Sequence, residues 1–387
     1  MRAQINFKEI EIFARKELKL LKGRICDLDL YKAGRNKDKK GGFNFYSRDL
    51  ILSSILLKDL QLLKNSLRLC AILQGTKNNP YNGEEKGKIF HEYPEKKKTE
   101  KEGRNTGFNA SDTTSLFIIG MAHYIKQTKD KEFLDEHQEN IIQGLKYLLK
   151  HIRKEIFWED PKFCNAKKFR LKSTYWKDTG FLGREDYKPF YPVAYSLVQA
   201  QVLSSLRAAN YLLSLIYGRS NPFLLNLAKK MNYQLWTSFW DKESKNFAVG
   251  IDKKGLIKSN SSDYLHFLYY LDEKDVSKRK LKLLIKKSRE LKTRFGYRGA
   301  IEKNLLHPYY SAIWPWEQGF IFLAGKKHKI KEITEISKKS LDAIIKLNCF
   351  PEVIKYFKGE LKVMKYNTQL WTIAYAIFLA QNFNKDL

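Results

Sequence analysis

The sequence contains few cysteines, and their spacing forms no metal-binding or redox motif. Cys26, Cys70, Cys164 and Cys349 lie far apart, and no CxxC occurs. A zinc site or a disulfide framework is therefore not expected, and reduced, buried thiols fit a reducing compartment. Nothing in the sequence suggests a metal or an organic cofactor, so we expect none.

Long apolar runs are also missing. No window approaches the roughly 18 apolar residues of a membrane span, and Glu317 interrupts the best candidate, SAIWPWEQGFIFLAG. The N-terminal MRAQINFKEIEIF carries Lys8, Glu9 and Glu11 where a signal peptide needs an uninterrupted apolar stretch. We expect a soluble, cytoplasmic protein with no membrane partner.

No linker rich in Pro, Gly or Ser divides the 387 residues, and no sequence repeat is obvious. Hydrophobic residues make up 43% of the chain and aromatics 14%, which is enough for a packed core and excludes global disorder. A single domain spanning residues 1–387 is the simplest organisation. The sequence does not indicate an oligomeric state.

Acidic residues are scarce relative to basic ones. The chain has 72 Lys and Arg against 42 Asp and Glu, a formal net charge of +30, which is compatible with nucleic-acid binding. The lysines, however, are spread from end to end. In KLKLLIKKSRELKTR (280–294), leucines and Ile285 fall near one helical face with lysines around them, which is typical of an amphipathic helix with a solvated basic side. No specific nucleic-acid partner is expected.

Helical periodicity dominates the chain, since apolar residues recur at steps of three and four. Asn221-Pro222 has the composition of a helix start, with Asn as N-cap and Pro in the first turn. The sequence FWDKESKNFAVGIDKKG (239–255) predicts a small hairpin. The predicted helices cover 9–21, 48–73, 113–127, 135–156, 194–217, 223–239, 261–271, 277–291, 315–325, 330–346 and 368–382. Alternation of helices with long loops suggests a mainly α fold of helical hairpins arranged around an axis.

The long loops between these helices hold carboxylates beside Trp, Tyr or Arg, and such loops are uncommon in compact domains unless they have a function. Each residue also has a plainer interpretation. Asp49 and Asp112 fit helix N-caps, Glu352 fits a solvated loop residue, and the tryptophans fit the core. The segments are GGFNFYSRDL (41–50), GKIFHE (87–92) with NASDTTSLFI (109–118), STYWKDTGF (173–181) and CFPEVIKYFKG (349–359).

Taken together, these segments resemble the catalytic domain of glycogen-debranching enzymes, the amylo-α-1,6-glucosidases. The most specific match is QGTKNNPYNGEEKGKIFHE, which is similar to that family's G…EPGKI-HE segment. The order of the motifs is preserved over roughly residues 41 to 380. The other matching segments are YSRDLILSSILL, ASDTTSLFIIGMAHYIKQTKD, STYWKDTG, TRFGYRGA, SAIWPWEQGFIFLAG and FPEVIKYFKG followed by NTQLWTIAYA.

The resemblance implies an (α/α)₆ barrel of six inner and six outer helices with the substrate pocket in the loops at one end. It also implies an inverting glycosidase, in which a carboxylic acid protonates the glycosidic oxygen while a carboxylate activates water. By position in the motifs, Asp178 is the general acid and Glu352 the general base. Trp176 and Phe181 flank Asp178 and favour its protonated form by desolvation, whereas the adjacent Lys177 opposes it.

The resemblance further implies a set of sugar-binding residues, and thus a carbohydrate substrate such as an α-glucan or oligosaccharide. Charged side chains give short, directional hydrogen bonds to hydroxyls, and tryptophan faces suit the C–H surface of a sugar. For at least one tryptophan we expect core packing instead. The implied set is Arg48, Asp49, His91, Glu92, Asp112, Trp176, Lys177, Arg298, Trp314, Trp316, Gln369 and Trp371.

The sequence departs from the family pattern at two positions. Pro308-Tyr309 replaces the family's YH, and Ala194 or Tyr195 stands where a glutamate is usual. We also expect no accessory N-terminal β-domain, because the SRD segment begins at residue 47. These departures leave open a related barrel enzyme of other specificity, such as a glucoamylase, a trehalase or a processing α-glucosidase. They also leave open a catalytically silent carbohydrate-binding protein.

Overall fold

The computed structural model describes residues 7–35, 44–94, 105–177, 188–301, 311–364 and 367–383. The described chain is mainly helical, as the sequence predicted. Helices alternate along the chain between almost fully buried ones and amphipathic ones that bury a single face. The buried helices are α2 (Ser47–Leu57), α4 (Thr113–Thr128), α7 (Ser196–Tyr217), α9 (Asp263–His266) continued by the 3₁₀ helix η4 (Phe267–Tyr270), α11 (Pro315–Lys327) and α14 (Leu370–Phe383).

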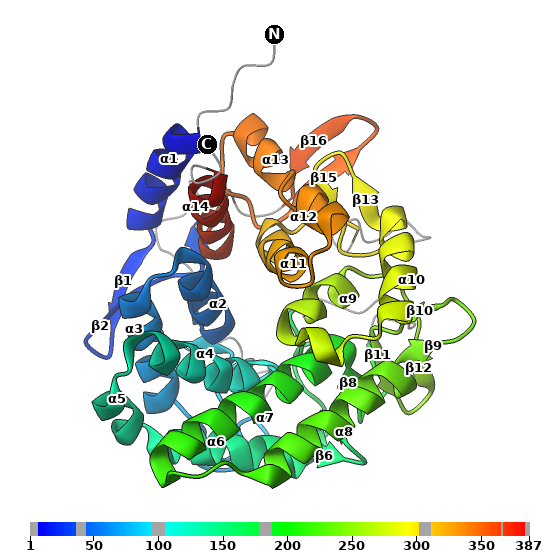
Figure 1. Ribbon diagram of the computed structural model, residues 1–387. Coiled ribbons are helices and arrows are strands. Elements are labelled where there is room, and N and C mark those ends of the chain that lie inside the picture. Colours follow the sequence, from blue (N-terminus) through cyan, green and yellow to red (C-terminus); the bar gives the residue numbers. More distant parts are fainter. Residues whose placement is uncertain are drawn as a thin grey trace.

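These buried segments form a closed ring. Helix α2 contacts α4, α4 contacts α7, α7 contacts α9 and η4, these contact α11, α11 contacts α14, and α14 contacts α2. Figure 1 shows the ring from one end. This arrangement is consistent with the prediction of helical hairpins around an axis.

The amphipathic helices pack on the outside of the ring. Those from α3 onward contact a buried helix next to them in the chain, so the chain repeatedly crosses from the inner to the outer layer and back, whereas α1 packs against α14 from the other end of the chain. The outer helices are α1 (Phe7–Lys19), α3 (Leu60–Ile72), α5 (Lys131–Glu136), α6 (Gln138–His151), α8 (Pro222–Ser238), α10 (Lys278–Ser288), α12 (Lys331–Ser337) and α13 (Ser340–Leu347), with short 3₁₀ helices η2 (Pro161–Cys164), η5 (Glu273–Asp275) and η6 (Arg289–Leu291).

Several predicted helices are broken in the structure. The predicted helix 48–73 is two, because Lys58 adopts a left-handed conformation (φ 54°) and the Asp59 side chain caps the next helix by accepting a hydrogen bond from the Leu62 N–H at 2.8 Å. Likewise, 135–156 falls on the end of α5 and on α6, and 330–346 falls on α12 and α13. The start of α8 is as predicted, since Asn221 is its N-cap and Pro222 its first residue.

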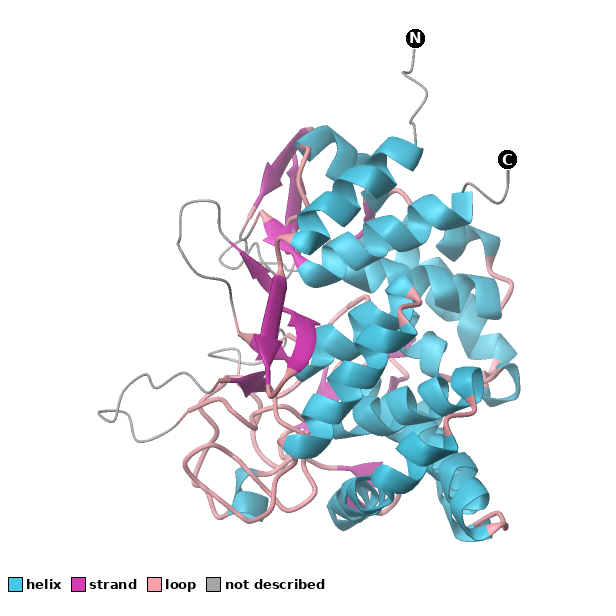
Figure 2. Ribbon diagram, turned by 90° about the vertical axis from the view of Figure 1, so that its left-hand side faces the viewer, coloured by secondary structure: helices cyan, strands magenta, loops and turns pink. Residues whose placement is uncertain are grey.

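The strands are short, and several lie directly before an inner helix, where they pair with a distant loop. The predicted hairpin 239–255 is two successive hairpins, β9–β10 and β11–β12. Figure 2 shows most strands and long loops gathered on one side of the helices. The antiparallel pairs are β1 (Lys22–Ile25) with β2 (Leu28–Tyr31), β3 (Gly34–Arg35) with β17 (Thr368–Gln369), β4 (Phe45–Tyr46) with β5 (Glu92–Tyr93), β6 (Ile152–Arg153) with β7 (Ile156–Phe157), β8 (Ala194–Tyr195) and β12 (Gly255–Ile257) on either side of β11 (Gly250–Asp252), β9 (Trp240–Asp241) with β10 (Asn246–Phe247), β13 (Lys292–Thr293) with β14 (Gly296–Tyr297), and β15 (Ile354–Phe357) with β16 (Glu360–Val363).

The four cysteines are free: Cys70 and Cys164 are buried, Cys349 is half-buried and Cys26 is exposed. Among the described helices, none combines the length and the apolar character needed to cross a membrane.

Candidate active site

Most of the predicted site residues lie at the N-terminal ends of the inner helices. Arg48 and Asp49 are in the first turn of α2, Asp112 precedes α4, and Trp176 and Lys177 lie in the loop before α7. Trp314 and Trp316 flank the start of α11, and Gln369 and Trp371 flank that of α14. Side-chain contacts join several of these ends directly, so residues distant in the sequence share one end of the ring.

The starts of α2 and α4 are joined by a buried, bidentate ion pair. Arg48 donates from Nε and Nη2 to the two carboxylate oxygens of Asp112, both at 2.8 Å. Asp112 occupies the N-cap position of α4 but makes no side-chain capping hydrogen bond, and Asp49 lies in the first turn of α2 rather than at its cap. The plain capping interpretation of these two acids is therefore not the one the structure adopts.

The GKIFHE segment (87–92) runs beside both of these helix starts. Thr113 Oγ1 donates to the Ile89 carbonyl and Thr114 Oγ1 accepts from the Ile89 N–H, each at 2.9 Å. The Ser47 N–H donates to the His91 carbonyl at 3.2 Å. These backbone hydrogen bonds place His91 and Glu92 beside the segment that carries Arg48 and Asp49.

His91 and Glu92 are both buried. The His91 ring packs edge-on to Tyr46 with 5.2 Å between centroids, and its Nδ1 lies 3.3 Å from the Thr106 carbonyl oxygen. Glu92 accepts hydrogen bonds from Tyr46 Oη at 2.8 Å, from Asn44 Nδ2 at 3.2 Å and from the Thr106 hydroxyl. Glu92 thus accepts several of its hydrogen bonds from residues of the neighbouring loops, which it helps to hold in place.

A second buried ion pair lies at the start of α9. Lys177 Nζ donates to Asp263 Oδ1 at 3.2 Å, to Ser261 Oγ at 2.8 Å and to the Gly299 carbonyl at 3.0 Å. The Trp176 indole N–H donates to the same Asp263 oxygen at 2.9 Å. The ammonium of Lys177 is thus held by a carboxylate and two neutral oxygens. No sequence motif pointed to Asp263.

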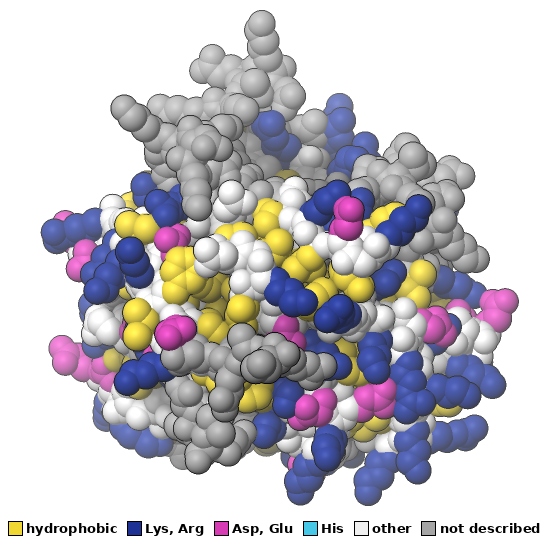
Figure 3. Space-filling view, turned by 90° about the horizontal axis from the view of Figure 1, so that it is seen from above, with side chains coloured by type: hydrophobic (Ala, Val, Ile, Leu, Met, Phe, Trp, Pro, Cys, Tyr) yellow, Lys and Arg dark blue, Asp and Glu magenta, His cyan; other side chains and the backbone are white. Residues whose placement is uncertain are grey.

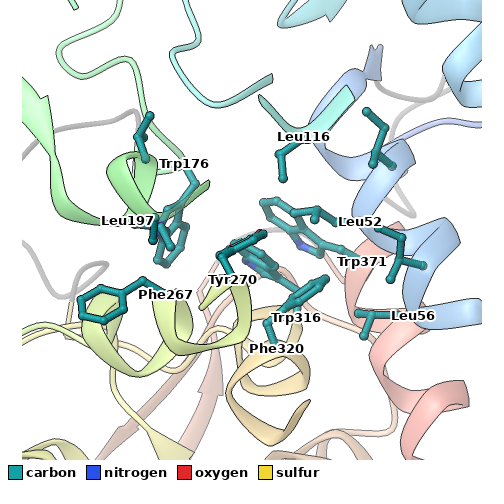
Figure 4. Packing of buried hydrophobic residues seen from close by; sticks show 14 of the residues in the cluster. Leu52, Leu56, Leu116, Trp176, Leu197, Phe267, Tyr270, Trp316, Phe320 and Trp371 are labelled. Carbon is teal, nitrogen blue, oxygen red and sulfur yellow. The ribbon is translucent and has the colours of Figure 1, made fainter. Parts of the chain in front are cut away.

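The tryptophans pack in the core of the ring (Figure 4). Trp314, Trp316 and Trp371 are at most 5% exposed, and Trp316 stacks on Trp371 with 4.8 Å between ring centroids. Trp176 meets both Trp314 and Trp316 at right angles, with 5.1 Å between centroids in each case. The expectation that at least one tryptophan packs in the core is borne out for the stacked pair.

Glu317, in the first turn of α11, is a buried acid that sequence reasoning treated only as an interruption of an apolar run. Its carboxyl oxygens lie 2.8 and 2.7 Å from Ser262 Oγ, which is also 3.1 Å from the Gly299 carbonyl oxygen. Burial raises the pKa of Glu317 to about 8, with Lys177 acting in the opposite direction and Asp263 in the same direction. The Ser262 hydroxyl has a single proton to donate. When Ser262 donates that proton to the Gly299 carbonyl, a protonated Glu317 can donate its own proton to Ser262 Oγ.

Glu352 lies beside the start of α14. The Gln369 N–H donates to the Phe350 carbonyl at 2.9 Å, and Thr372 Oγ1 donates to the Pro351 carbonyl at 2.8 Å. Glu352 is only 6% exposed, which rules out the plain interpretation of a solvated loop glutamate. Arg298, half-buried, pairs with Ile313 in the segment that leads into α11.

Asp178, Phe181 and Pro308-Tyr309, all named in the sequence analysis, lie outside the described residues. The role of Asp178 therefore stays a prediction. Ala194 or Tyr195 stands where the resembled family has a glutamate, and both are buried. Tyr195 stacks on Tyr175 with 4.7 Å between centroids, and its hydroxyl oxygen lies 3.3 Å from Ser173 Oγ. Burial raises the pKa of Tyr195 to about 12, so its side chain is a neutral phenol.

Elsewhere, a cavity of about 780 Å³ opens at the far end of α7. It lies at the opposite end of this 22-residue helix from Tyr195, and is lined by Leu213, Tyr217, Arg219, Ser220, Asn221 and Pro222. It contains no carboxylate and is separate from the site. Among the described residues, no cluster of His, Cys, Asp or Glu is arranged to hold a metal ion.

Comparison with known proteins gives a likeness in structure only. No family model matches the sequence, and no curated protein matches it. A GH63 mannosylglycerate hydrolase from Thermus thermophilus, solved with glucose, superposes with a TM-score of 0.67 at 11% identity, covering 96% of this chain and 99% of that chain.

Two rhamnosidases have the same helical architecture in part of longer chains. The enzyme from Klebsiella oxytoca, with rhamnose bound, gives a TM-score of 0.62 at 11% identity over 99% of this chain and 65% of that chain. The GH78 rhamnosidase of Bacillus sp. GL1 gives 0.63 at 11% identity over 98% of this chain and 35% of that chain. The chain therefore shares its fold with glycoside hydrolases of different specificities.

Proposed function

We propose that this chain is a single-domain (α/α)₆ glycoside hydrolase. In this proposal it is exo-acting and inverting, and it releases terminal glucose from an α-linked glucan or oligosaccharide, in the manner of an amylo-α-1,6-glucosidase. The fold shared with glycoside hydrolases supports the reaction class, and the closed ring of inner helices supports the barrel. The motif resemblance supports the choice of substrate.

One observation carries the proposal. Residues named from motifs scattered over the chain come together at one end of the helical ring, as the pairs Arg48–Asp112 and Trp176–Trp314 illustrate. A structural role alone does not require buried charges at the ends of several inner helices, because a buried charge is costly unless it is paired. A pocket that recognises a polyhydroxylated ligand has a use for them, because charged groups form short, strong hydrogen bonds to hydroxyls.

The chemistry assigned to this end is acid–base hydrolysis. Asp178 protonates the glycosidic oxygen, and Glu352 removes a proton from water that attacks the anomeric carbon from the opposite face. The leaving alcohol takes the proton of Asp178, and the sugar is released with inverted configuration. The two carboxyl groups need a separation of roughly 6.5–9.5 Å so that the water fits between them.

A second candidate specificity comes from one of the solved structures that share this fold. This chain and the mannosylglycerate hydrolase cover each other almost end to end. A glycosylglycerate is therefore the second candidate substrate, hydrolysed by the same pair of acids.

The test is a substrate panel followed by ¹H NMR. The purified protein is incubated with α-1,6-branched dextrin, isomaltose, maltose, trehalose, mannosylglycerate and an aryl rhamnoside, and the anomer that forms first is recorded. We expect glucose release from an α-glucoside with inversion. First formation of the retained anomer would contradict the mechanism, and release of another sugar alone would contradict the substrate.

Two variants test the assigned acids. Asp178→Asn and Glu352→Gln are each expected to lower kcat by at least about a hundredfold, since general acid–base catalysis contributes roughly 10²–10⁴-fold. Glu360→Gln, in the exposed β15–β16 hairpin, is the matched control. Near wild-type activity in either site variant removes that residue from its role. Sugar binding without turnover on any substrate would favour the silent carbohydrate-binding protein.

A further inference from the structure

Two charged residues of the segment QGTKNNPYNGEEKGKIFHE take no part in the predicted sugar-binding set. Glu85 is 1% exposed and Lys88 is fully buried. Both lie shortly before His91 and Glu92, which do belong to that set. Because a buried charge is costly unless it is paired, the partners of these two side chains indicate how the segment is held.

The last turn of α6 holds Glu85. Lys150 Nζ donates to Glu85 Oε2 at 2.8 Å, and His151 Nε2 lies 3.0 Å from the same oxygen. On the other side of the ring, His151 Nδ1 lies 2.9 Å from the Trp158 carbonyl oxygen. Both nitrogens of this fully buried ring therefore face oxygen atoms.

These two oxygens determine the protonation of the His151 ring. A carbonyl oxygen can only accept a hydrogen bond, so Nδ1 carries a proton and donates it to Trp158. Burial raises the pKa of Glu85, but His151 and the neighbouring ammonium groups outweigh burial and lower that pKa to about 2. Glu85 is therefore a carboxylate that can only accept, and Nε2 must carry a proton as well. A ring that donates from both nitrogens is an imidazolium.

The balance of buried charge leads to the same protonation state. Lys88 Nζ donates to Glu159 Oε1 at 3.1 Å. Two carboxylates and one ammonium leave one negative charge, which an imidazolium at His151 cancels. Lys150 lies outside this buried group, because its side chain is 47% exposed and therefore hydrated. The members of the group, each at most 1% exposed, are Glu85, Lys88, His151 and Glu159.

The other groups around His151 are neutral or aromatic. Burial raises the pKa of the Tyr147 phenol and of the Cys164 thiol, so within the described residues both face the charged group in their neutral form. The centroid of the His151 ring lies 4.1 Å from that of Phe163 and 5.4 Å from that of Phe157. Aromatic faces attract cations, and the helix dipole also favours a cation in the last turn of α6.

The segment that leads to the site is anchored on both sides of Gly87. Before Gly87, the Glu85 side chain is bonded to α6. The Gly87 N–H itself donates to the Gly75 carbonyl at 2.7 Å. After Gly87, both the N–H and the carbonyl of Ile89 are bonded to threonines of α4. Loss of the anchor at Glu85 releases the chain on the side from which it enters the site.

We propose that His151 is a buried imidazolium that acts, through Glu85, as a positioning residue for the GKIFHE segment. The inference rests on the proposed function and deepens it, because His91 and Glu92 of this segment are predicted to bind the sugar. His151 lies at the end of an outer helix and acts on the site only through the carboxylate of Glu85. The charge of the ring is what allows it to bond Glu85 and Trp158 at the same time.

Nuclear magnetic resonance of ¹⁵N-labelled histidine tests the charge. At pH 7 we expect both ring nitrogens of His151 in the wild type to have the chemical shift of protonated nitrogens. Glu85→Gln replaces the carboxylate by a neutral amide, so His151 should lose one proton and show one protonated and one unprotonated nitrogen. The His151 signals are those that disappear in His151→Gln. A wild-type ring with an unprotonated nitrogen, or an unchanged ring in Glu85→Gln, overturns the charge.

Two amide substitutions of His151 test the positioning role. The side-chain amide of glutamine places its N–H near the position of Nε2, towards Glu85, whereas that of asparagine places it near Nδ1, towards Trp158. We therefore expect hydrogen exchange at residues 87–92, measured by mass spectrometry, to be faster than wild type in His151→Asn and close to wild type in His151→Gln. Equal exchange in the two variants overturns the role of the bond to Glu85.

The kinetic readout uses the same two variants. His151→Asn should raise KM by about tenfold, the change expected when a hydrogen bond to the sugar is weakened, with kcat changed less, and His151→Gln should stay closer to the wild type. A fall in kcat that exceeds the rise in KM contradicts a role in sugar binding.

The matched control removes another buried acid of an ion pair. Asp275 accepts from Arg207 Nη2 at 2.7 Å, and Asp275→Asn should change neither KM nor hydrogen exchange at residues 87–92. If Asp275→Asn accelerates exchange there as much as His151→Asn does, the effect is general destabilisation and the positioning role is overturned.

The readouts separate the positioning role from the proposed function. A wild type that releases no sugar from any substrate counts against the proposed function, while hydrogen exchange and the histidine spectrum still decide the role of His151. If neither histidine variant folds, Glu85→Gln and Glu85→Leu give the same comparison from the other partner, since only the first keeps a hydrogen-bonding group for His151. Exchange at residues 87–92 that is no faster in Glu85→Leu than in Glu85→Gln then overturns the inference.

Discussion

The buried acids at the starts of the inner helices differ in the partner that each carboxyl group meets. Asp112 bonds a guanidinium through both oxygens, and Asp263 bonds an ammonium and several neutral donors. Glu317 meets the Ser262 hydroxyl at hydrogen-bonding distance and lies 3.9 Å from the His266 ring. Positively charged partners stabilise Asp112 and Asp263 as carboxylates, whereas the surroundings of Glu317 favour its protonated form.

Substitution of Glu317 tests this protonation state. Its pKa rises from 4.5 in the unfolded chain to about 8 in the folded one. Its stabilising contribution is therefore complete below pH 4.5 and is lost as the pH rises towards 8, by up to about 1.4 kcal/mol per pH unit. Glu317→Gln keeps a donor to Ser262 without an ionisable proton, so we expect its unfolding free energy to fall less than that of the wild type between pH 5 and 8.

Urea unfolding at several pH values measures this difference. Glu360→Gln, which removes an exposed acid that pairs with the equally exposed Lys362, is the control and should follow the wild-type curve. Parallel curves for the wild type and Glu317→Gln would contradict the protonated state.

The sequence predicts some of these residues and not others for a physical reason. Arg48, Asp112 and Trp176 could be named from the sequence because they lie in motifs whose local pattern is distinctive. Asp263 and Glu317 were not, because their partners are Lys177 and Ser262, 86 and 55 residues away in the chain. A buried acid in an apolar context, as in WPWEQGF, is the signal that could have indicated Glu317.

At the scale of elements, the segment before β5 connects two parts of the ring. Gly87 has φ +86°, and a side chain there would place Cβ 2.2 Å from the Gln143 carbonyl oxygen, so only glycine fits. The next residue, Lys88, is fully buried and pairs with Glu159 at 3.1 Å. Glu159 exchanges backbone hydrogen bonds with Val193, directly before β8 and α7. This ion pair thus links the GKIFHE segment to the start of α7.

Breaking the Lys88–Glu159 ion pair should lower the free energy of unfolding. Burial lowers the pKa of Lys88, but the charges of Glu159 and Glu85 outweigh burial and raise it, so Lys88 is charged in the folded chain. Lys88→Met leaves Glu159 buried without its ammonium, and we expect a loss of about 3–5 kcal/mol in unfolding free energy by urea denaturation. Lys88→Met/Glu159→Gln should recover part of that loss, because no unpaired charge remains.

The control for this pair is an exposed lysine. Lys362→Met breaks a pair whose side chains are both 68% exposed, so it should leave the urea midpoint unchanged. If Lys88→Met unfolds at the wild-type urea concentration, or if the double variant is as unstable as the sum of the singles, the pair does not link the two segments.

Helix existence could be read from the sequence better than helix boundaries. The apolar periodicity of 48–73 continues across Lys58 and Asp59, and the break there depends on a left-handed residue and a capping carboxylate. Alternation of inner and outer helices is a property of tertiary packing. It becomes visible only when contacts such as α14 with α2 close the ring.

For the whole molecule, the dominant feature is its positive charge. Figure 3 shows Lys and Arg side chains spread around one face, with Asp and Glu among them. Many lysines are paired with acids on the surface, for example Lys258 with Glu243 at 2.7 Å and Lys287 with Glu290 at 2.8 Å. A dispersed charge of this kind supports solubility and gives only a weak attraction to polyanions.

Binding to duplex DNA tests this interpretation of the charge. Lysines that point in all directions bring few ammonium groups to one duplex at a time, and buried acids such as Asp49, Asp112 and Glu352 would repel phosphates at the proposed pocket. We expect dissociation constants no tighter than roughly 10⁻⁴–10⁻⁶ M at physiological salt, the range of non-specific contacts. Fluorescence anisotropy with two unrelated duplexes at 50 and 200 mM salt measures both affinity and selectivity. The affinities should be equal for the two sequences and should weaken as salt increases. Tight binding to one duplex that persists at 200 mM salt would mean that the lysines form a dedicated nucleic-acid surface, because only a clustered array releases enough counterions to reach that affinity.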